Sequence, residues 1–278
     1  MLRFTLVTIL IAACAIGANA QNLSQTGASP LAVTGISQPG KFPIKISKSG
    51  SYRLNNNLTV KSGVSADAID VLVPNVTIDL SGFTITGGLV AINALTSDAA
   101  NVTVSGGSIA GSGAGVLLAD GAVVRNVRVS GVTGSAIAFS GAIVCGSSCT
   151  VTGNTVYDVT PVNSGAPPSA IAVGSNSLVS NNTVTGTIGG SSVGVGIGSN
   201  SLVSGNTICN NANTGILAFG SGVMVSHNTI SNNLVGLNFP AVAGGFENNI
   251  LINNGTDVTG TGTSLAGGNT NLCTSGVC

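Results

Sequence analysis

Three charged residues close together in the sequence could act on an anionic ligand. Asp120, Arg125 and Arg128 lie within nine residues of one another. Two guanidinium groups can hold a carboxylate through paired hydrogen bonds, and a neighbouring carboxylate can accept a proton. The pattern therefore makes these residues candidates for binding and transforming an acidic sugar. The alternative is a surface ion pair between Asp120 and Arg125, which contributes little to stability.

The other titratable residues are scattered along the chain. The sequence holds eight acidic residues, eight basic residues and one histidine, and its formal net charge is zero. Four basic residues fall between Lys41 and Arg53, which we interpret as the charged end cap of the fold, the alternative being a binding patch. No acids have calcium-loop spacing, so we expect no metal and no cofactor. With no basic excess and few aromatic residues, we expect no nucleic-acid partner.

The N-terminal segment has the features of an export signal. Arg3 precedes an apolar run, and Ala18, Asn19 and Ala20 match a small-residue cleavage site, so we expect cleavage after Ala20 and a secreted, extracellular or periplasmic protein. The alternative is a lipid anchor on Cys14, because residues 11–14 read IAAC, as in a bacterial lipobox. No later stretch reaches about 18 apolar residues, so we expect no membrane span.

The cysteines that follow this segment are expected to form disulfides in an oxidising compartment. Cys145 and Cys149 could close a small loop, CGSSC, and Cys273 could pair with Cys278 in the tail. Cys209 is left over and is expected to face outward. We therefore predict that the tail folds back and offers it a partner.

A repeated phrase organises the second half of the chain. It reads GSNSLVSNNTVTG from Gly174, GSNSLVSGNTICNN from Gly198 and GSGVMVSHNTISNN from Gly220. This spacing suits one turn of a solenoid, and short runs of β-branched residues between Gly, Ser and Asn predict strands joined by tight corners. Aligned on one reference column, the repeats give Phe83, Gly107, Val127, Asn154, Asn182, Asn206, Asn228 and Asn249.

The columns around this reference predict the inside of each coil. The position before it holds only Gly, Asn and His227, which tolerate a left-handed backbone, so each coil is expected to bend there. Asn154, Asn182, Asn206, Asn228 and Asn249 are expected to point inward and to form a hydrogen-bonded ladder with about 4.8 Å between coils. Two apolar columns form the predicted core: Leu80, Val104, Val124, Val151, Val179, Val203, Val225 and Phe246, and Ile85, Ile109, Val129, Val156, Val184, Ile208, Ile230 and Leu251.

The repeats resemble the right-handed parallel β-helix proteins of the pectin-lyase-like superfamily. The resemblance runs from about Asp67 to Gly260 and is carried by V-S-x-N-T-[VI] repeats and by the run NVTIDLSGFTITG from Asn75. It implies an all-β fold, a right-handed parallel β-helix of about eight or nine coils; period and alternation alone leave the hand open. We divide the chain into a signal peptide (1–20), a lead-in and cap (21–66), β-helix repeats (67–260) and a C-terminal tail (261–278).

That superfamily includes secreted polysaccharide lyases, hydrolases and epimerases, which act in a groove along the first strands of the coils. Here we predict those strands at residues 136–139, 170–173, 194–197 and 216–219, and their outward positions hold only Ala, Gly and Ile216. These residues cannot transfer protons, so the favoured hypothesis is a non-catalytic surface or structural scaffold with weak glycan binding. The alternative is a polysaccharide lyase or epimerase that uses Asp120, Arg125 and Arg128 on an acidic glycan.

Three further expectations concern the outer surface. The apolar column Val123, Leu178, Leu202 and Met224 points outward and is expected to be covered by a loop, the tail or another subunit. The longer insertions at residues 140–148 and 159–169 are candidates for a lip over a ligand. Outward amides are predicted after the third strand of the last coils, at Asn210, Asn211, Asn232, Asn233, Asn253 and Asn254.

Overall fold

The structure, a computed structural model, describes residues 32–96, 98–134, 141–160, 169–189, 191–240, 243–261, 263–264 and 270–274. Within these residues there is no helix, and the strands run parallel in two sheets, of ten and nineteen strands. The chain forms a parallel β-solenoid of about eight turns. The predicted signal peptide, its cleavage site and the alternative lipid site at Cys14 lie outside the described residues.

Each coil contributes one strand to the ten-stranded sheet and two segments to the other sheet. The ten-stranded sheet holds β2 (Ile44–Ile46), β5 (Ile69–Val71), β8 (Val90–Ala94), β10 (Ala114–Leu118), β12 (Gly141–Cys145), β15 (Ser169–Val173), β18 (Val193–Ile197), β21 (Thr214–Ala218), β24 (Val235–Phe239) and β27 (Thr256–Gly260).

The larger sheet consists of two rows of strands that meet at a corner, and β9 and β11 run through this corner without a break. The first row holds β1 (Val33–Ile36), β3 (Gly50–Leu54), β6 (Val76–Asp79), β9 (Thr103–Ala110), β11 (Val123–Val132), β13 (Thr150–Thr152), β16 (Leu178–Ser180), β19 (Leu202–Ser204), β22 (Val223–Ser226), β25 (Gly244–Glu247) and β28 (Thr263–Ser264). The second row adds β4 (Leu58–Thr59), β7 (Thr84–Thr86), β14 (Thr155–Val159), β17 (Thr183–Thr187), β20 (Thr207–Cys209), β23 (Thr229–Ser231), β26 (Ile250–Ile252) and β29 (Leu272–Cys273). The predicted cap region therefore already contains strands β1 to β4.

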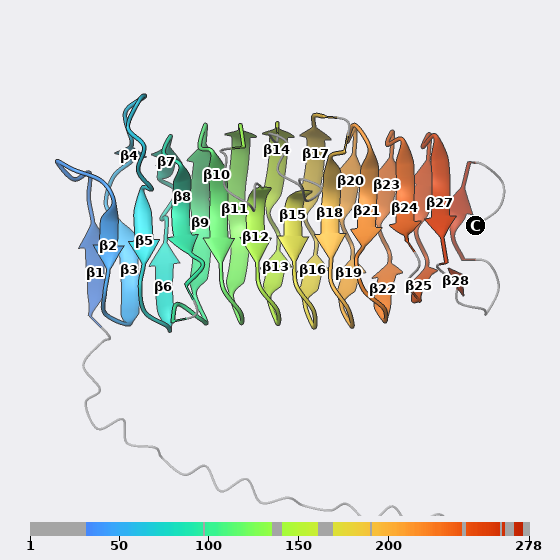
Figure 1. The fold of residues 1–278 in the computed structure, drawn as a ribbon, viewed down its shortest axis with the longest axis horizontal. Helices are drawn as coiled ribbons and strands as arrows, with labels where there is room; N and C mark the ends of the chain where they lie inside the picture. Colours follow the sequence, from blue (N-terminus) through green and yellow to red (C-terminus); the bar gives the residue numbers. More distant parts are fainter. Residues whose placement is uncertain are drawn as a thin grey trace, which may run out of the picture. The chain divides into compact units, whose positions relative to one another are not determined.

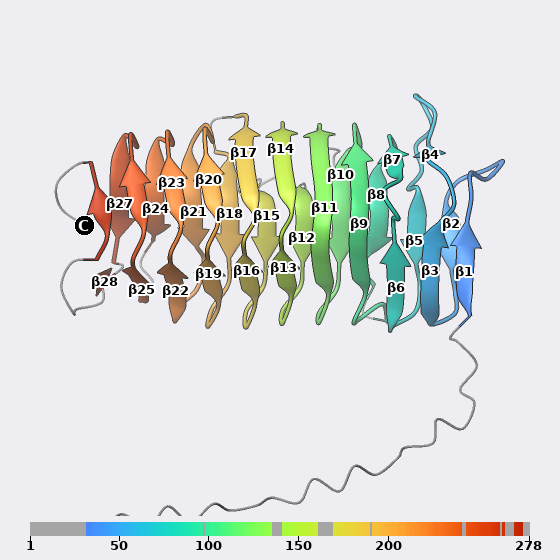
Figure 2. The ribbon, with the colours of Figure 1, turned by 180° about the vertical axis from the view of Figure 1, so that it is seen from behind.

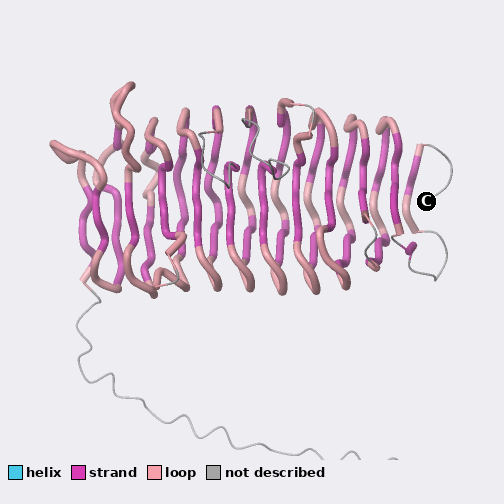
Figure 3. The backbone as a smooth tube through the Cα atoms, viewed as in Figure 1, coloured by secondary structure: helices cyan, strands magenta, loops and turns pink. Residues whose placement is uncertain are grey.

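The coil is right-handed, as the resemblance implied. Figure 1 shows the ten-stranded sheet on the near side with strands such as β18 and β21 running downward. Figure 2, from behind, shows β9, β11 and β14 running upward. Because the stack advances from β1 toward β27 as the chain makes this circuit, each turn follows the hand preferred for parallel crossovers. The tube in Figure 3 shows the successive turns stacked along one axis.

The core columns occupy the predicted positions, with one shift in the first coil. The column two after the reference pairs as predicted from Ile85 to Leu251, and its members are fully buried. In the other column, Ile78 rather than Leu80 pairs with Val104. Leu80 is still buried, because the corner of that coil is longer and turns through Ser81 and Gly82, both at positive φ.

The corner before the reference column has the predicted left-handed backbone in every coil. The φ values run from 54° at Asn126 and Asn248 to 80° at Gly82, and His227 has a φ of 58°. Gly, Asn and His were predicted at this corner because L residues with larger or branched side chains are strained there. His227 is exposed and serves as a corner residue.

The predicted asparagine ladder forms at this corner, pointing inward. In each step the backbone N–H and Nδ2 of one Asn donate to Oδ1 of the next, as from Asn206 to Asn228 at 2.9 Å each. The ladder runs through Asn154, Asn182, Asn206, Asn228 and Asn249 and continues to Asn271, which the alignment did not include. Since all of these amides are buried, the ladder satisfies polar groups that would otherwise be costly inside the core.

A second ladder corrects the predicted outward amides. Asn211 and Asn233 are buried, and each donates from its backbone N–H and Nδ2 to Oδ1 of the next coil at 3.1 Å, ending at Asn254. Only Asn210, Asn232 and Asn253 are exposed, and all three have positive φ. The prediction was right for these three and wrong for Asn211 and Asn233, because the chain turns at the exposed residues and directs the next side chain inward.

Candidate functional site

The three predicted site residues lie at different places on the coil. Asp120 follows β10, and its Oδ1 accepts a hydrogen bond from the Ser147 N–H at 2.7 Å. Arg125 and Arg128 lie on β11, on either side of the corner at Asn126, and both are exposed. No ion pair joins Asp120 to either arginine among the described residues. The structure therefore supports neither the predicted Asp120–Arg125 ion pair nor a shared anion site, and this site stays a prediction.

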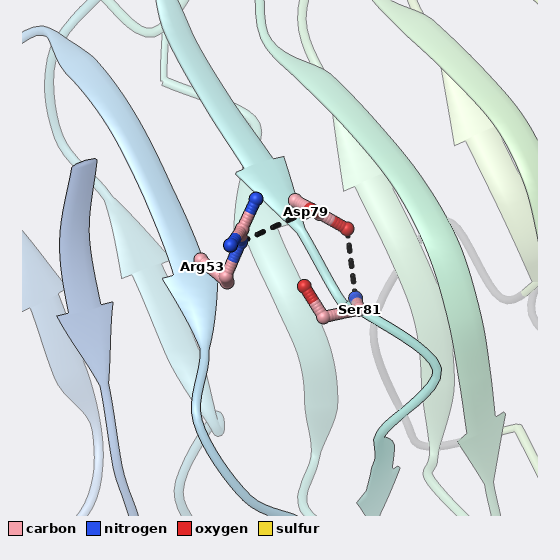
Figure 4. Close-up of polar contacts among 3 residues, drawn as sticks. All are labelled: Arg53, Asp79 and Ser81. Carbon is pink, nitrogen blue, oxygen red and sulfur yellow. Dashed lines mark hydrogen bonds and ion pairs between the residues drawn. The ribbon is translucent and has the colours of Figure 1, made fainter. Parts of the chain in front are cut away.

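The ion pair that does form lies in the same outward column as Arg125, two coils earlier. Arg53 pairs with Asp79, with Nε and Oδ2 3.4 Å apart, and Asp79 Oδ1 accepts the Ser81 N–H at 2.7 Å. Figure 4 shows that the carboxylate bridges the guanidinium and the backbone of the corner. Ser105 separates Asp79 from Arg125 along this column. Both members of the pair are well exposed, so the pair contributes little to stability.

Arg128 contacts an aromatic ring rather than an acid. Its guanidinium carbon lies 4.8 Å from the centre of the Tyr157 ring, and its Nε donates to the Tyr157 hydroxyl at 3.1 Å. Hydrogen bonds from Ser130 and Arg128 lower the pKa of Tyr157. The pair forms a cation–π contact on the exposed face of β11 and β14, with no acid bonded to it among the described residues.

The structure reveals a carboxyl pair that the sequence reasoning had counted among the scattered acids. Asp67 and Asp70 flank the first residues of β5 on the outer face of the ten-stranded sheet, and Asp70 pairs in register with Lys45 and Asn93. Asp67 accepts the Val90 N–H at 3.0 Å and the Asn93 Nδ2 at 2.8 Å. Asp70 is hydrogen-bonded to Asp67, and its own Oδ1 is buried without a partner among the described residues. Two acids, a lysine and an amide thus lie on or beside three neighbouring strands, β2, β5 and β8.

The strand geometry explains why acids three residues apart share one face. In a regular strand, residues i and i+3 point to opposite sides, but here Ala68 and Ile69 both point into the core. The same pattern, a small residue followed by an aliphatic one, recurs in Ala91 and Ile92 and in Ala170 and Ile171. The sequence signal that could have identified the pair is this repeated small–aliphatic step.

Burial is the main reason that the pKa of Asp70 departs from its usual value. Burial, followed by the hydrogen bond and the negative charge of Asp67, raises the pKa of Asp70 to about 6, while the Lys45 charge opposes this shift. A carboxyl whose pKa is higher in the fold than in the unfolded chain stabilises the fold only when protonated. This contribution is complete below about pH 3.9 and is lost as the pH rises through about 6.

We therefore expect Asp70→Asn to stabilise the protein at pH 7.5 and to flatten its stability between pH 4.5 and 7.5. Asp70 is partly exposed, so the gain should be about 1 kcal/mol, or about 2–4 °C in Tm. Thermal melts at the two pH values measure it, with the exposed Asp98→Asn as control. A variant that keeps the full pH slope of the parent would contradict the assignment to Asp70.

The ten-stranded face beyond this pair matches the prediction only in part. Ile171, Val173, Val195 and Ile197 are buried in the core, as expected. Residues 136–139 lie outside the described residues, and the strand of that coil is β12. In β21 the predicted frame was wrong: Ile216 and Ala218 face the core, and Phe219 is 46% exposed. Ala170, predicted outward, is also buried in the core. The outward positions of β12, β15, β18 and β21 still carry no titratable side chain.

The cysteines adopt three different states. Cys145 and Cys149 are free, buried thiols hydrogen-bonded to each other, which raises the pKa of Cys145 and lowers that of Cys149. Their predicted disulfide is not formed in the structure and stays a prediction. Cys273 is disulfide-bonded, while its predicted partner Cys278 lies outside the described residues. Cys209 is half-buried and free, so the prediction that the tail supplies its partner was wrong.

The outward apolar column lines a groove, which we call the outer groove. Leu178, Leu202 and Met224 stack in register, and Leu202 is 37% exposed, so the expected cover is not present among the described residues. Asn176 and Asn200 flank the column at corners with positive φ. The groove has a volume of about 710 Å³ and is lined by Ser148, Cys149, Thr150, Asn176, Ser177, Leu178, Asn200, Ser201, Leu202, Gly222 and Met224. Its one titratable group, Cys149, is buried.

Comparisons with known proteins give structural likeness alone. No protein-family model and no curated protein sequence matches the chain. A mutant of the periplasmic alginate epimerase AlgG has a TM-score of 0.44 and 11% identity over 82% of this chain, which spans 65% of that protein's length. The A-module of the Azotobacter vinelandii mannuronan C-5 epimerase AlgE6 gives 0.39 and 11% over 88% of this chain and 89% of the module. The Dettilon tailspike protein gives 0.40 and 12% over 80% of this chain and 55% of the tailspike.

Within the described residues no helix is long and apolar enough to cross a membrane. The sheet topology and the direction of the coil make the chain a right-handed parallel β-helix.

Proposed function

We propose that the chain is an exported, non-catalytic β-helix scaffold that makes weak, repeated contacts with a glycan along the outer groove. The observation that carries this proposal is the composition of that groove. Its apolar centre of Leu178, Leu202 and Met224 offers surface for the non-polar faces of sugar rings, and Asn176 and Asn200 offer amides for their hydroxyls. Its exposed lining has no acid or base that could act on a bound sugar.

The periodicity of the groove supports contact with a chain molecule rather than with a compact ligand. Leu202 pairs directly with Leu178 and Met224 in the neighbouring coils, so equivalent contacts recur about every 4.8 Å along the axis. A polymer with repeating units can occupy several such positions at once, and several weak contacts then sum to a useful affinity. The amides and hydroxyls of the lining can hydrogen-bond a polar ligand directly or through water.

A second function is favoured by one specific observation. The carboxyl pair Asp67 and Asp70, with Lys45 on the neighbouring strand, places a carboxyl of pKa about 6 next to a second carboxyl and a cation on the ten-stranded sheet. A general acid and a general base with separated pKa values are what sugar chemistry requires. We keep a polysaccharide lyase or epimerase acting on an acidic glycan as the alternative, with this pair in place of Asp120, Arg125 and Arg128.

One panel of experiments separates the two functions. The full chain is incubated with neutral and acidic oligosaccharides, binding is followed by calorimetry, and products are followed by absorbance of unsaturated sugars and by NMR of the sugar protons. For the scaffold we expect binding without product, and at least a fivefold weaker affinity in Leu202→Ser/Met224→Ser. The control Thr207→Ser, an exposed hydroxyl of the same coil on β20, should bind as the parent does.

The same experiments have outcomes that would contradict each function. Product that disappears in Asp70→Asn would replace the scaffold function by the enzyme. The enzyme function would be contradicted if no acidic glycan gave product and if Asp70→Asn left glycan binding unchanged. Groove variants that bind every glycan as tightly as the parent would remove the outer groove as the contact surface.

A further inference from the structure

The first coils concentrate positive charge in a chain that is neutral overall. Residues 32–66 contain Lys41, Lys45, Lys48, Arg53 and Lys61 and no acidic residue. One of these cations, Arg53, is paired with Asp79, the ion pair formed among the described residues. Lys41 and Lys61 are exposed and have no described carboxylate within ion-pair distance. A charged end cap would protect the sheet edge wherever its lysines lay. The end-cap role therefore does not explain why Lys41 and Lys61 lie where they do.

Lys41 and Lys61 line the same cavity at this end of the solenoid. The cavity has a volume of about 550 Å³ and lies between the connection from β1 to β2 and the connection from β4 to β5. In Figure 1 both connections rise from the blue and cyan end of the stack. Its volume falls in the range of small-molecule sites, about 300–1,000 Å³.

Hydrogen bonds hold the two walls of the cavity in place. The Thr59 N–H donates to Gln38 Oε1 at 2.7 Å, and Gln38 Nε2 donates to the Thr59 carbonyl at 3.1 Å. The Gln38 side-chain amide therefore joins one wall of the cavity to the other. The Gln38 N–H donates to Asn56 Oδ1 at 2.9 Å. On the far side, the Leu89 N–H donates to the Ala66 carbonyl at 2.9 Å and fixes the end of the second wall to the next coil. The cavity is therefore formed before any ligand arrives.

The lining combines two ammonium groups with an apolar surface. Phe42 packs against the core and is half-buried, while Pro39 and Val64 continue the apolar part of the lining. The nearest acid along the chain, Asp67, has its carboxylate engaged by the Val90 N–H and the Asn93 amide. The positive charge of the cavity is thus not neutralised from within. The aromatic ring offers a flat surface for a sugar ring, and lysine ammonium groups attract an anion.

We propose that this cavity binds a sugar that carries an anionic group, with Lys41 and Lys61 on the anion and Phe42 against the ring. This inference rests on the glycan contact proposed above and adds a second, charge-selective subsite at the N-terminal end of the solenoid. The carboxyl or sulfate group of the sugar supplies the same recognition chemistry.

Calorimetry with the full chain tests the proposal. The probes are a uronic-acid oligosaccharide, the same oligosaccharide with its carboxyl groups reduced to neutral alcohols, a sulfated oligosaccharide and inorganic sulfate. We expect the anionic oligosaccharides to bind at least tenfold more tightly than the reduced one. Lys41→Gln/Lys61→Gln should abolish this preference, and raising the salt from about 50 to 300 mM should weaken it in the parent.

Matched variants distinguish this subsite from general charge attraction and from the outer groove. Lys48→Gln removes an exposed cation outside the cavity lining and should keep the preference. Equal losses in Lys48→Gln and in the double variant, equal binding of the acidic and reduced oligosaccharides, or binding of inorganic sulfate as tight as that of the sugars would overturn the proposal. If acidic and reduced sugars bind equally and only Leu202→Ser/Met224→Ser weakens both, the result would contradict the cavity as a binding site and support the outer groove.

Discussion

Replacing Asn206 by Leu is expected to destabilise the protein by on the order of 4 kcal/mol, although the two side chains are similar in size. Asn206 is 1% exposed, and its Oδ1 accepts the backbone N–H of Asn182 at 2.9 Å and the Asn182 Nδ2 at 3.0 Å. Its own Nδ2 donates to Asn228 Oδ1 and to the Val179 carbonyl. Leucine leaves the Asn182 N–H buried without an acceptor, and each such unsatisfied group costs about 1–3 kcal/mol.

The loss should spread beyond one coil because the ladder is continuous. Asn206 accepts from Asn182 and donates to Asn228, so removing this amide leaves both neighbours with incomplete bonding. For a chain of this size the expected fall in Tm is about 8–16 °C, measured by circular dichroism. Thr207→Leu places the same side chain at the next, exposed position and should shift Tm by less than about 2 °C. An Asn206→Leu melt as close to the parent as the control would show that the ladder does not stabilise the solenoid.

The sequence predicted most accurately those features that depend on a single repeated constraint. The left-handed corner accepts few residue types, so Gly, Asn and His at one column located it in every coil. The ladder followed because a polar residue inside a core must find a partner, and the partner in a solenoid is the equivalent residue of the next coil. Only Asn271, which lies 22 residues after Asn249 and beyond the last aligned repeat, was missed.

The errors occurred where simple alternation of strand faces does not hold. Asn211 and Asn233 follow residues at positive φ, so the chain turns and the expected outward side chain points inward. In the ten-stranded sheet two consecutive residues face the core, which reversed the frame predicted for Ile216 and Ala218 and concealed the pairing of Asp67 with Asp70. The Arg53–Asp79 ion pair was not predicted, because the longer first corner places Asp79 rather than Ser81 in the outward column that also holds Arg53 and Ser105.

Adding a single methyl group at Gly215 is expected to destabilise the solenoid by about 1–3 kcal/mol through overpacking. A Cβ at this position would lie 2.7 Å from the Gly236 carbonyl oxygen, 2.9 Å from Ile230 Cγ2 and 3.1 Å from Asn233 Nδ2. Gly215 occupies the small position of the small–aliphatic step, where Ala170 carries its methyl group in an earlier coil. A methyl group fits at Ala170 but not at Gly215, because the second asparagine ladder begins only at Asn211 and its side chains fill the space facing the later glycines.

The measurement is a set of thermal or urea melts of Gly215→Ala beside Gly40→Ala. A Cβ at Gly40 meets no atom within 4 Å, so that variant should be neutral or slightly more stable, since alanine restricts the unfolded chain. Gly194→Ala should resemble Gly215→Ala, because its Cβ would lie 2.9 Å from Asn211 Nδ2. If Gly215→Ala were as stable as Gly40→Ala, the two ladders and the glycine column would not be packed against one another. Since the outer groove and the cationic cavity are shaped by successive coils, a substitution that changes coil spacing at this column should also weaken glycan contact along the groove.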